Sequence, residues 1–174
     1  SGNTEGAANT GIGFEALRAN IDGDNNVAVG YQALENFEAA SNGQGQNTAL
    51  GYRAGQNNVT GIYNTWLGYQ SGLNASGSVA NLNAGVGYRA LEALTSGSEN
   101  TALGAYAALQ LQNAKDIVAL GHYSLANANT STDIDGCVAI GSYSQAENKT
   151  GIGNISIGRS ALQQDVNSDY NTVI

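Results

Sequence analysis

Hydrophobic and polar positions along this chain repeat in a short phrase: Asn, a β-branched residue, a small residue, an aliphatic residue and Gly. The phrase occurs ten times, for example at residues 26–30, 47–51 and 64–68, and the copy at residues 171–174 lacks the glycine. The closing glycines are 17 to 21 residues apart, and 17 is the commonest spacing. A repeat of this period, lengthened only by short insertions, predicts coils stacked into a solenoid.

The alternation within each phrase predicts a short strand with two faces. The first and third positions are mostly β-branched or aliphatic, so we expect them to point inward and to form apolar ladders along the stack. The middle position is Gly, Ala or Ser in eight of ten copies, and we expect it to point outward. A small outward column lets another backbone approach closely, which favours a subunit contact; neutral drift in an Ala-rich sequence is the alternative. The trimer contacts expected on this basis are Ala28, Ala49, Gly85, Ala102, Ala119 and Ala139.

The repeat therefore predicts an all-β fold, a parallel β-solenoid of about ten rungs of 17–21 residues, in a single repeat domain over residues 1–174. We expect residues 1–8 to be an expression scar and a cap, residues 9–174 to be the repeats, and the C-terminal end to be an excision point. Three residues after each closing glycine stands Ala or Ser, which predicts a tight corner. Stacked Asn side chains predict a hydrogen-bonded ladder that Ile117 and Cys137 interrupt.

Charge and composition narrow the classes of function. The net charge of −8, with only six basic residues, argues against nucleic acid as a partner. No run of apolar residues is long enough for a membrane span, so we expect no membrane insertion. A single cysteine excludes an intrachain disulfide, so rigidity has to come from stacking and from oligomerisation.

The segment Asn-Thr-Ala-Leu-Gly-Tyr-Arg-Ala at residues 47–54 is similar to repeats of phage tail fibres. It also resembles the head repeats of trimeric autotransporter adhesins of the YadA type. The longer and less uniform coils of this chain favour the tail-fibre-like branch. The resemblance implies a left-handed β-roll in which three chains share one axis, and hence a homotrimer.

The same resemblance implies an extracellular fibre on a phage particle or a bacterial cell surface. Such a fibre has structural and adhesive roles, attaching to a host cell through surface glycan or lipopolysaccharide. Two alternatives stay open. One is a monomeric solenoid that binds ice or another ordered surface through its Thr column, and the other is a polysaccharide-cleaving fibre domain.

Aromatic residues supply the candidate ligand contacts. Tyr31, Tyr52, Tyr69 and Tyr88 each follow a closing glycine directly, where they suit either sugar faces or packing between subunits. Trp66 interrupts the small middle column and is either a filler of a local gap or a ligand platform. Phe37, in the polar insertion at residues 35–46, either tucks onto the coil or serves as a contact. Insertions at residues 73–82 and 126–136 are further places where functional variation is expected.

No constellation predicts catalysis or a metal site. The segment from Asp22 to Asn26 resembles the start of a calcium loop but lacks the later bidentate Glu, because position 33 is Ala. Asp133 and Asp135 have no supporting ligands in the sequence pattern. His122 is the only histidine, and no carboxylates pair at a fixed spacing. We therefore expect no enzyme activity, no cofactor and no metal.

Overall fold

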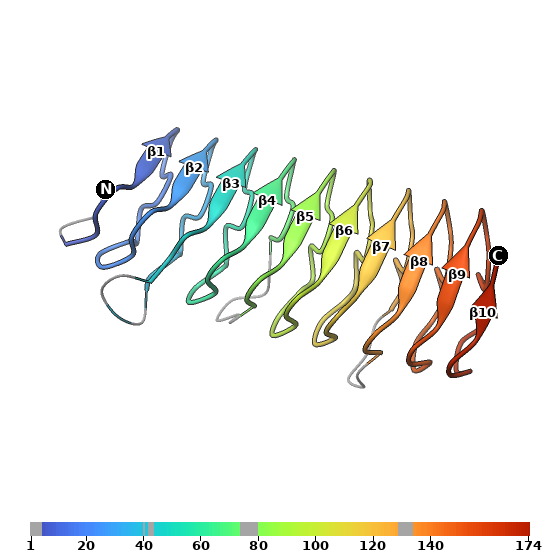
Figure 1. Ribbon diagram of the computed structural model, residues 1–174. Helices are drawn as coiled ribbons and strands as arrows, with labels where there is room; N and C mark the ends of the chain where they lie inside the picture. Colours follow the sequence, from blue (N-terminus) through green and yellow to red (C-terminus); the bar gives the residue numbers. More distant parts are fainter. Residues whose placement is uncertain (1–4, 40, 42–43, 74–79, 129–133) are drawn as a thin grey trace.

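The computed structural model describes residues 5–39, 41, 44–73, 80–128 and 134–174. Its strands form one sheet in which every neighbouring pair is parallel and the spatial order follows the chain order (Figure 1). This confirms the parallel β-solenoid predicted from the repeat. The strands are β1 Thr10–Ile12, β2 Val27–Val29, β3 Thr48–Leu50, β4 Thr65–Leu67, β5 Ala84–Val86, β6 Thr101–Leu103, β7 Val118–Leu120, β8 Val138–Ile140, β9 Ile155–Ile157 and β10 Thr172–Val173.

The register places each position of the phrase on the same position of the next rung. Ala28 of β2 pairs with Ala49 of β3, and Leu103 of β6 pairs with Leu120 of β7. The chain therefore forms columns of equivalent residues that run along the rod. With strands about 4.8 Å apart, the nine steps from β1 to β10 span about 43 Å.

The direction of the two strand faces is the reverse of the prediction. In β3 the middle residue Ala49 is fully buried, whereas Leu50 is 48% exposed. The same alternation of a buried middle residue and more exposed neighbours holds from β2 to β9. The small column therefore lies inside the coil of a single chain and is not a surface for subunit contact. The residues concerned are Ala28, Ala49, Gly85, Ala102, Ala119 and Ala139.

The narrow cross-section of the coil explains this reversal. Behind the sheet, the turn after the closing glycine sends two consecutive side chains into the interior in most rungs, for example Ala33 and Leu34, both fully buried. The Ala or Ser that we expected to mark a tight corner lies in this turn, as expected, and its side chain points into the interior, as at Ala33, Ala54 and Ala90. Leucine from the turn fills most of the available volume, so the strand contributes only a small side chain to the close-packed core. The larger aliphatic residues of the strand are left outside.

Trp66 of β4 is the exception in the small column, and two glycines accommodate it. The fourth residue after the closing glycine is Leu in rungs such as those of Leu34 and Leu91, but it is Gly55 and Gly72 in the two rungs around β4. A Cβ atom at Gly72 would lie 2.2 Å from the indole Cδ2 atom, and one at Gly55 would lie 2.5 Å from Cδ1. The indole therefore occupies the space that two leucine side chains take elsewhere.

The predicted Asn ladder forms along the inner edge of the sheet. The backbone N–H of Asn64 donates to Oδ1 of Asn47 at 2.9 Å, and that of Asn83 donates to Oδ1 of Asn64 at 2.9 Å. At one of the two interruptions, the thiol of Cys137 donates to the carbonyl oxygen of Gly151 at 3.3 Å. Cys137 is a buried part of the coil, as expected for a structural position.

Candidate binding surfaces

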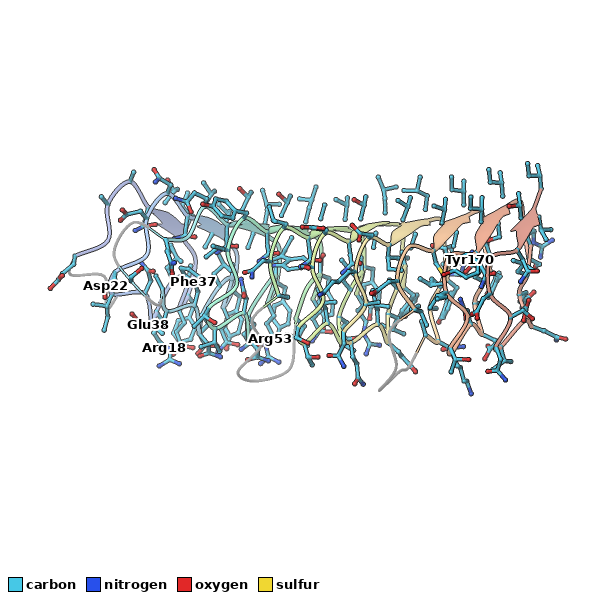
Figure 2. The ribbon with its side chains drawn as sticks, turned by 60° about the horizontal axis from the view of Figure 1, so that its bottom comes forward. Arg18, Asp22, Phe37, Glu38, Arg53 and Tyr170 are labelled. Carbon is cyan, nitrogen blue, oxygen red and sulfur yellow. The ribbon has the colours of Figure 1, made fainter. Side chains whose placement is uncertain are left out.

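The outward side chains of the strands form a continuous surface of aliphatic and Thr side chains, which we call the sheet face. It consists of the first and third strand positions of all ten rungs, and Figure 2 shows these side chains projecting from the row of strands away from the coil. Its third-position column is aliphatic throughout. Its most exposed members include Ile12 at 59%, Leu50 at 48%, Leu67 at 41% and Leu103 at 54%. A long apolar surface of this kind is rare on monomeric soluble proteins and marks an interaction site.

The insertions leave the sheet face unbroken. All three lie between the turn that follows one strand and the strand of the next rung, at residues 35–46, 73–82 and 126–136. Residues 40, 42–43, 74–79 and 129–133 of these segments, including Asp133, are outside the described residues. Within the insertions, the described residues next to these gaps pack into the core: Ala39, Ala80, Ala128 and Ile134 are all buried. The register between neighbouring strands is therefore the same with or without an insertion.

A second surface runs along the edge of the sheet, just beyond the closing glycines. We call it the aromatic lane, and it consists of Phe14, Tyr31, Tyr52, Tyr69 and Tyr88. Successive ring centroids are 5.0 to 5.3 Å apart and the ring planes are within 16° of parallel. The four tyrosines are 38% to 43% exposed. The four tyrosines that the sequence singled out as candidate ligand contacts therefore lie together in this lane and are accessible to solvent.

Beyond Tyr88 the aromatic column moves one residue along the chain. Tyr106 meets Tyr88 edge-on, at 5.1 Å and 70°, and begins a second stack with Tyr123 and Tyr143. Partial desolvation raises the pKa of the Tyr88 phenol, and the neighbouring Tyr106 adds a smaller effect in the same direction. His122 lies beside this second stack, with its ring edge-on to Tyr123 at 4.6 Å.

Arginines flank the aromatic lane at the position after the tyrosine. The guanidinium of Arg53 lies 5.1 Å from the centre of the Tyr52 ring, and its Nε donates to Oε1 of Gln32. Arg89 lies 5.8 Å from the Tyr106 ring and pairs with Glu92 at 2.6 Å. The hydrogen bond to this carboxylate raises the pKa of Arg89 above its ordinary value. The positive charges of the lane are thus few and already engaged with neighbouring side chains.

Two of the six candidate ligand residues are not at the surface. Trp66 and Phe37 are both fully buried, and Figure 2 shows Phe37 inside the coil. Of the alternatives for each, Trp66 is the gap filler and Phe37 tucks onto the coil. The two glycines in the leucine column next to Trp66 were the sequence signal that could have indicated its burial.

Neither a metal centre nor a membrane span is evident in the part of the chain that the structure describes. No cluster of three or more His, Cys, Asp or Glu side chains there could hold a metal ion. Among the same residues there is no helix long and apolar enough to cross a bilayer. Comparison of the chain with protein-family models, curated proteins and solved structures gives no match.

Proposed function

We propose that this chain is a structural and adhesive segment of a homotrimeric extracellular fibre, a tail fibre or surface adhesin, that attaches to glycan on a host cell surface. The observation that carries the proposal is the sheet face, an apolar surface that extends over all ten strands of one chain. Packing three such faces around a common axis covers them and closes the assembly. In this proposal the trimer contacts lie on the two outward columns of the strands, and not on the small middle column for which the sequence predicted them.

The energetics favour coverage of the sheet face. Burying the exposed half of an aliphatic side chain gives roughly 1 kcal/mol, so a column of ten supplies a substantial driving force before the cost of association is deducted. The exposed residues of the neighbouring column are Thr or β-branched aliphatic, and none is charged. An interface without buried charge suits a permanent fibre, in which the subunits do not need to separate.

The molar mass in solution tests the trimer. Size-exclusion chromatography with light scattering is expected to give three chains per particle. The double variant Leu67→Lys/Leu103→Lys puts charge on the sheet face and is expected to lower the mass to that of one chain. Ile21→Lys, at a residue that is 43% exposed outside the strands, is the matched control and is expected to stay trimeric. A wild-type mass of one chain would remove this proposal.

Attachment is tested separately with immobilised lipopolysaccharide and capsular polysaccharide, to which the wild-type protein is expected to bind. The proposal assigns no catalysis to the chain, so incubation with the same polysaccharides is expected to release no oligosaccharide. Multiple weak sites on one trimer would give avidity without a deep pocket.

A specific observation favours one alternative function. Thr10, Thr48, Thr65 and Thr101 point outward on a regular sheet, in contrast to the inward direction expected from the sequence. A flat array of hydroxyl and methyl groups is the kind of surface that orders water, so binding of ice by a monomer is the second candidate. The Thr column is interrupted in half of the rungs, which weakens this candidate relative to the trimer. The interruptions are Val27, Ala84, Val118, Val138 and Ile155. Thermal hysteresis shown by a monomeric wild-type protein would favour it.

A further inference from the structure

The rings of the aromatic lane are spaced at nearly constant intervals along the rod. From Phe14 to Tyr88 the four centroid separations are 5.3, 5.3, 5.0 and 5.1 Å. Backbone hydrogen bonds between successive rungs hold this spacing from both sides. The N–H of Gly51 donates to Val29 O at 2.8 Å before the ring, and that of Arg53 donates to Tyr31 O at 2.8 Å after it. From Tyr31 to Tyr88 the lane therefore presents one phenol per rung at fixed intervals. Because the rings are already ordered, binding costs little side-chain entropy.

What the lane offers to a ligand is ring edges and hydroxyl groups. The faces of Tyr31, Tyr52 and Tyr69 lie against neighbouring rings on both sides, so a sugar cannot stack on them. The C-terminal face of Tyr88 lies against Tyr106. The phenol hydroxyls of Tyr31, Tyr52 and Tyr69 have no hydrogen-bond partner within the described residues. Each of these hydroxyls is available both as a donor and as an acceptor.

We infer that the aromatic lane binds a neutral, linear, β-1,4-linked hexose chain that lies parallel to the rod axis with one sugar on each rung. This inference rests on the proposed function, because it names the glycan class for which one surface of the fibre is suited. Equatorial linkages make such a chain an extended ribbon, in which the length of one sugar is close to the spacing of the lane. α-Linked glucans curve into helices and leave a straight row of hydroxyls after a few sugars.

The net charge of the chain favours an uncharged glycan as the ligand of the aromatic lane. The chain carries 14 acidic and six basic residues, so for a ligand of the aromatic lane its overall field favours a neutral polymer over a polyanion. Within the lane itself all five side chains are uncharged. The adjacent Arg53 is already engaged with Tyr52 and Gln32. Neutral hydroxyl groups of a hexose chain match the row of phenols without a desolvated charge on either side.

The length of the oligosaccharide provides the first test, by isothermal titration calorimetry on the wild-type protein. Cellohexaose spans the four tyrosines, whereas cellobiose reaches only two, so we expect the dissociation constant of cellohexaose to be at least about ten times lower. Maltohexaose has the same sugars in α-linkage and is expected to give no measurable heat. Equal affinity for cellohexaose and maltohexaose, or no binding of cellohexaose, would overturn the inference.

Removal of hydroxyls alone provides the second test. In Tyr52→Phe/Tyr69→Phe the rings remain to keep the stack, which near-ultraviolet circular dichroism checks, but two hydrogen-bonding groups are lost. We expect the dissociation constant of cellohexaose to rise by roughly one order of magnitude. Tyr170→Phe, at a tyrosine that is 76% exposed and outside the lane, is expected to bind as the wild type does. An unchanged affinity in the double variant would also overturn the inference.

The two proposals fail in different ways. A trimer that binds lipopolysaccharide but not cellohexaose keeps the proposed function and overturns the lane as a glycan site. A single-chain particle that binds cellohexaose with the expected length dependence keeps the lane and removes the trimeric fibre.

Discussion

At the scale of the residue, the strictest requirement falls on the glycine that closes each strand. Gly51 has a φ of 139°, and a Cβ atom there would lie 2.4 Å from the carbonyl oxygen of Gly68 on the next rung. That oxygen belongs to the backbone of a stacked coil and cannot move without disturbing the stack. The recurrence of this glycine therefore reflects both its backbone conformation and the close approach of the next rung.

We expect Gly51→Ala to lower the free energy of unfolding by at least about 2 kcal/mol, because it combines strain with a backbone clash. Chemical denaturation followed by circular dichroism measures the effect. Gly11→Ala is the matched control, since its new Cβ would lie 3.5 Å from the nearest atom, in ordinary contact, at a position that holds Ala in other rungs. Comparable losses in the two variants would contradict this account of the closing glycine.

Cys137 gives the chain a specific pH dependence. Burial raises the pKa of its thiol, so the unfolded chain loses this proton at a lower pH than the folded chain does. Above the ordinary thiol pKa the folded state holds more protons, and the free energy of unfolding falls as pH rises. We expect this fall in the wild type to exceed that in Cys137→Ser by up to about 1.4 kcal/mol per pH unit above pH 8.5. Urea denaturation at pH 7, 9 and 10 with reductant provides the comparison, and equal slopes would contradict it.

At the scale of the element, the Asn ladder ties a strand to the next coil wherever the phrase begins with Asn. Asn64 donates through Nδ2 to the carbonyl oxygen of Ala80 at 2.7 Å, and its Oδ1 accepts the backbone N–H of Asn83. Removing the side chain in Asn64→Ala leaves both buried partners without a hydrogen bond. We expect a loss of about 2–4 kcal/mol in the free energy of unfolding.

Asn171→Ala is the control for the ladder. The side chain of Asn171 donates to Oδ1 of Asn154 at 3.0 Å, and the backbone N–H of Asn171, which donates to the same oxygen, is retained in the variant. We expect a loss below about 1 kcal/mol there. If the two Asn variants lose the same stability, the ladder contributes no more than a local turn preference.

The ladder and the strands could be predicted from the sequence because both depend on period alone. The ten copies of the phrase fixed which residues pair, and the structure places Leu50 beside Leu67 as the period requires. The direction of the faces could not be predicted in this way, because an alternating strand looks the same from either side. What decides it is the volume that the turn residues fill: Leu34 and Leu91 occupy the core, which leaves room only for a small residue, Gly, Ala or Ser, on most strands.

The candidate site residues show the same distinction between what the repeat period predicts and what side-chain packing decides. The members of the aromatic lane were found because each stands at a fixed offset from a glycine, and position in a solenoid sets exposure. Trp66 and Phe37 were ambiguous because each is a single departure from the pattern. The neighbours decide such cases: Gly55 and Gly72 make room for the indole inside the coil.

At the scale of the whole molecule, stability is a sum of rungs and of contacts between adjacent rungs. The columns that run along the rod belong to no single rung, yet each rung contributes one member to every column. The sheet face, the aromatic lane and the Asn ladder are therefore properties that grow with the number of coils. A change that removes a complete rung shortens all three without breaking the remaining contacts.

Deletion of residues 104–120 tests this description. It joins Leu103 to Gly121, which follows Leu120, the residue that pairs with Leu103 in the sheet, so every column closes in register. We expect a folded, β-rich rod that is shorter by about 4.8 Å and less stable than the wild type, measured by circular dichroism and small-angle X-ray scattering. Deletion of residues 104–112 removes about half a rung, puts polar residues in core columns, and is expected to unfold the rungs that follow. Equal stability of the two deletions would show that the rungs do not stack as interchangeable units.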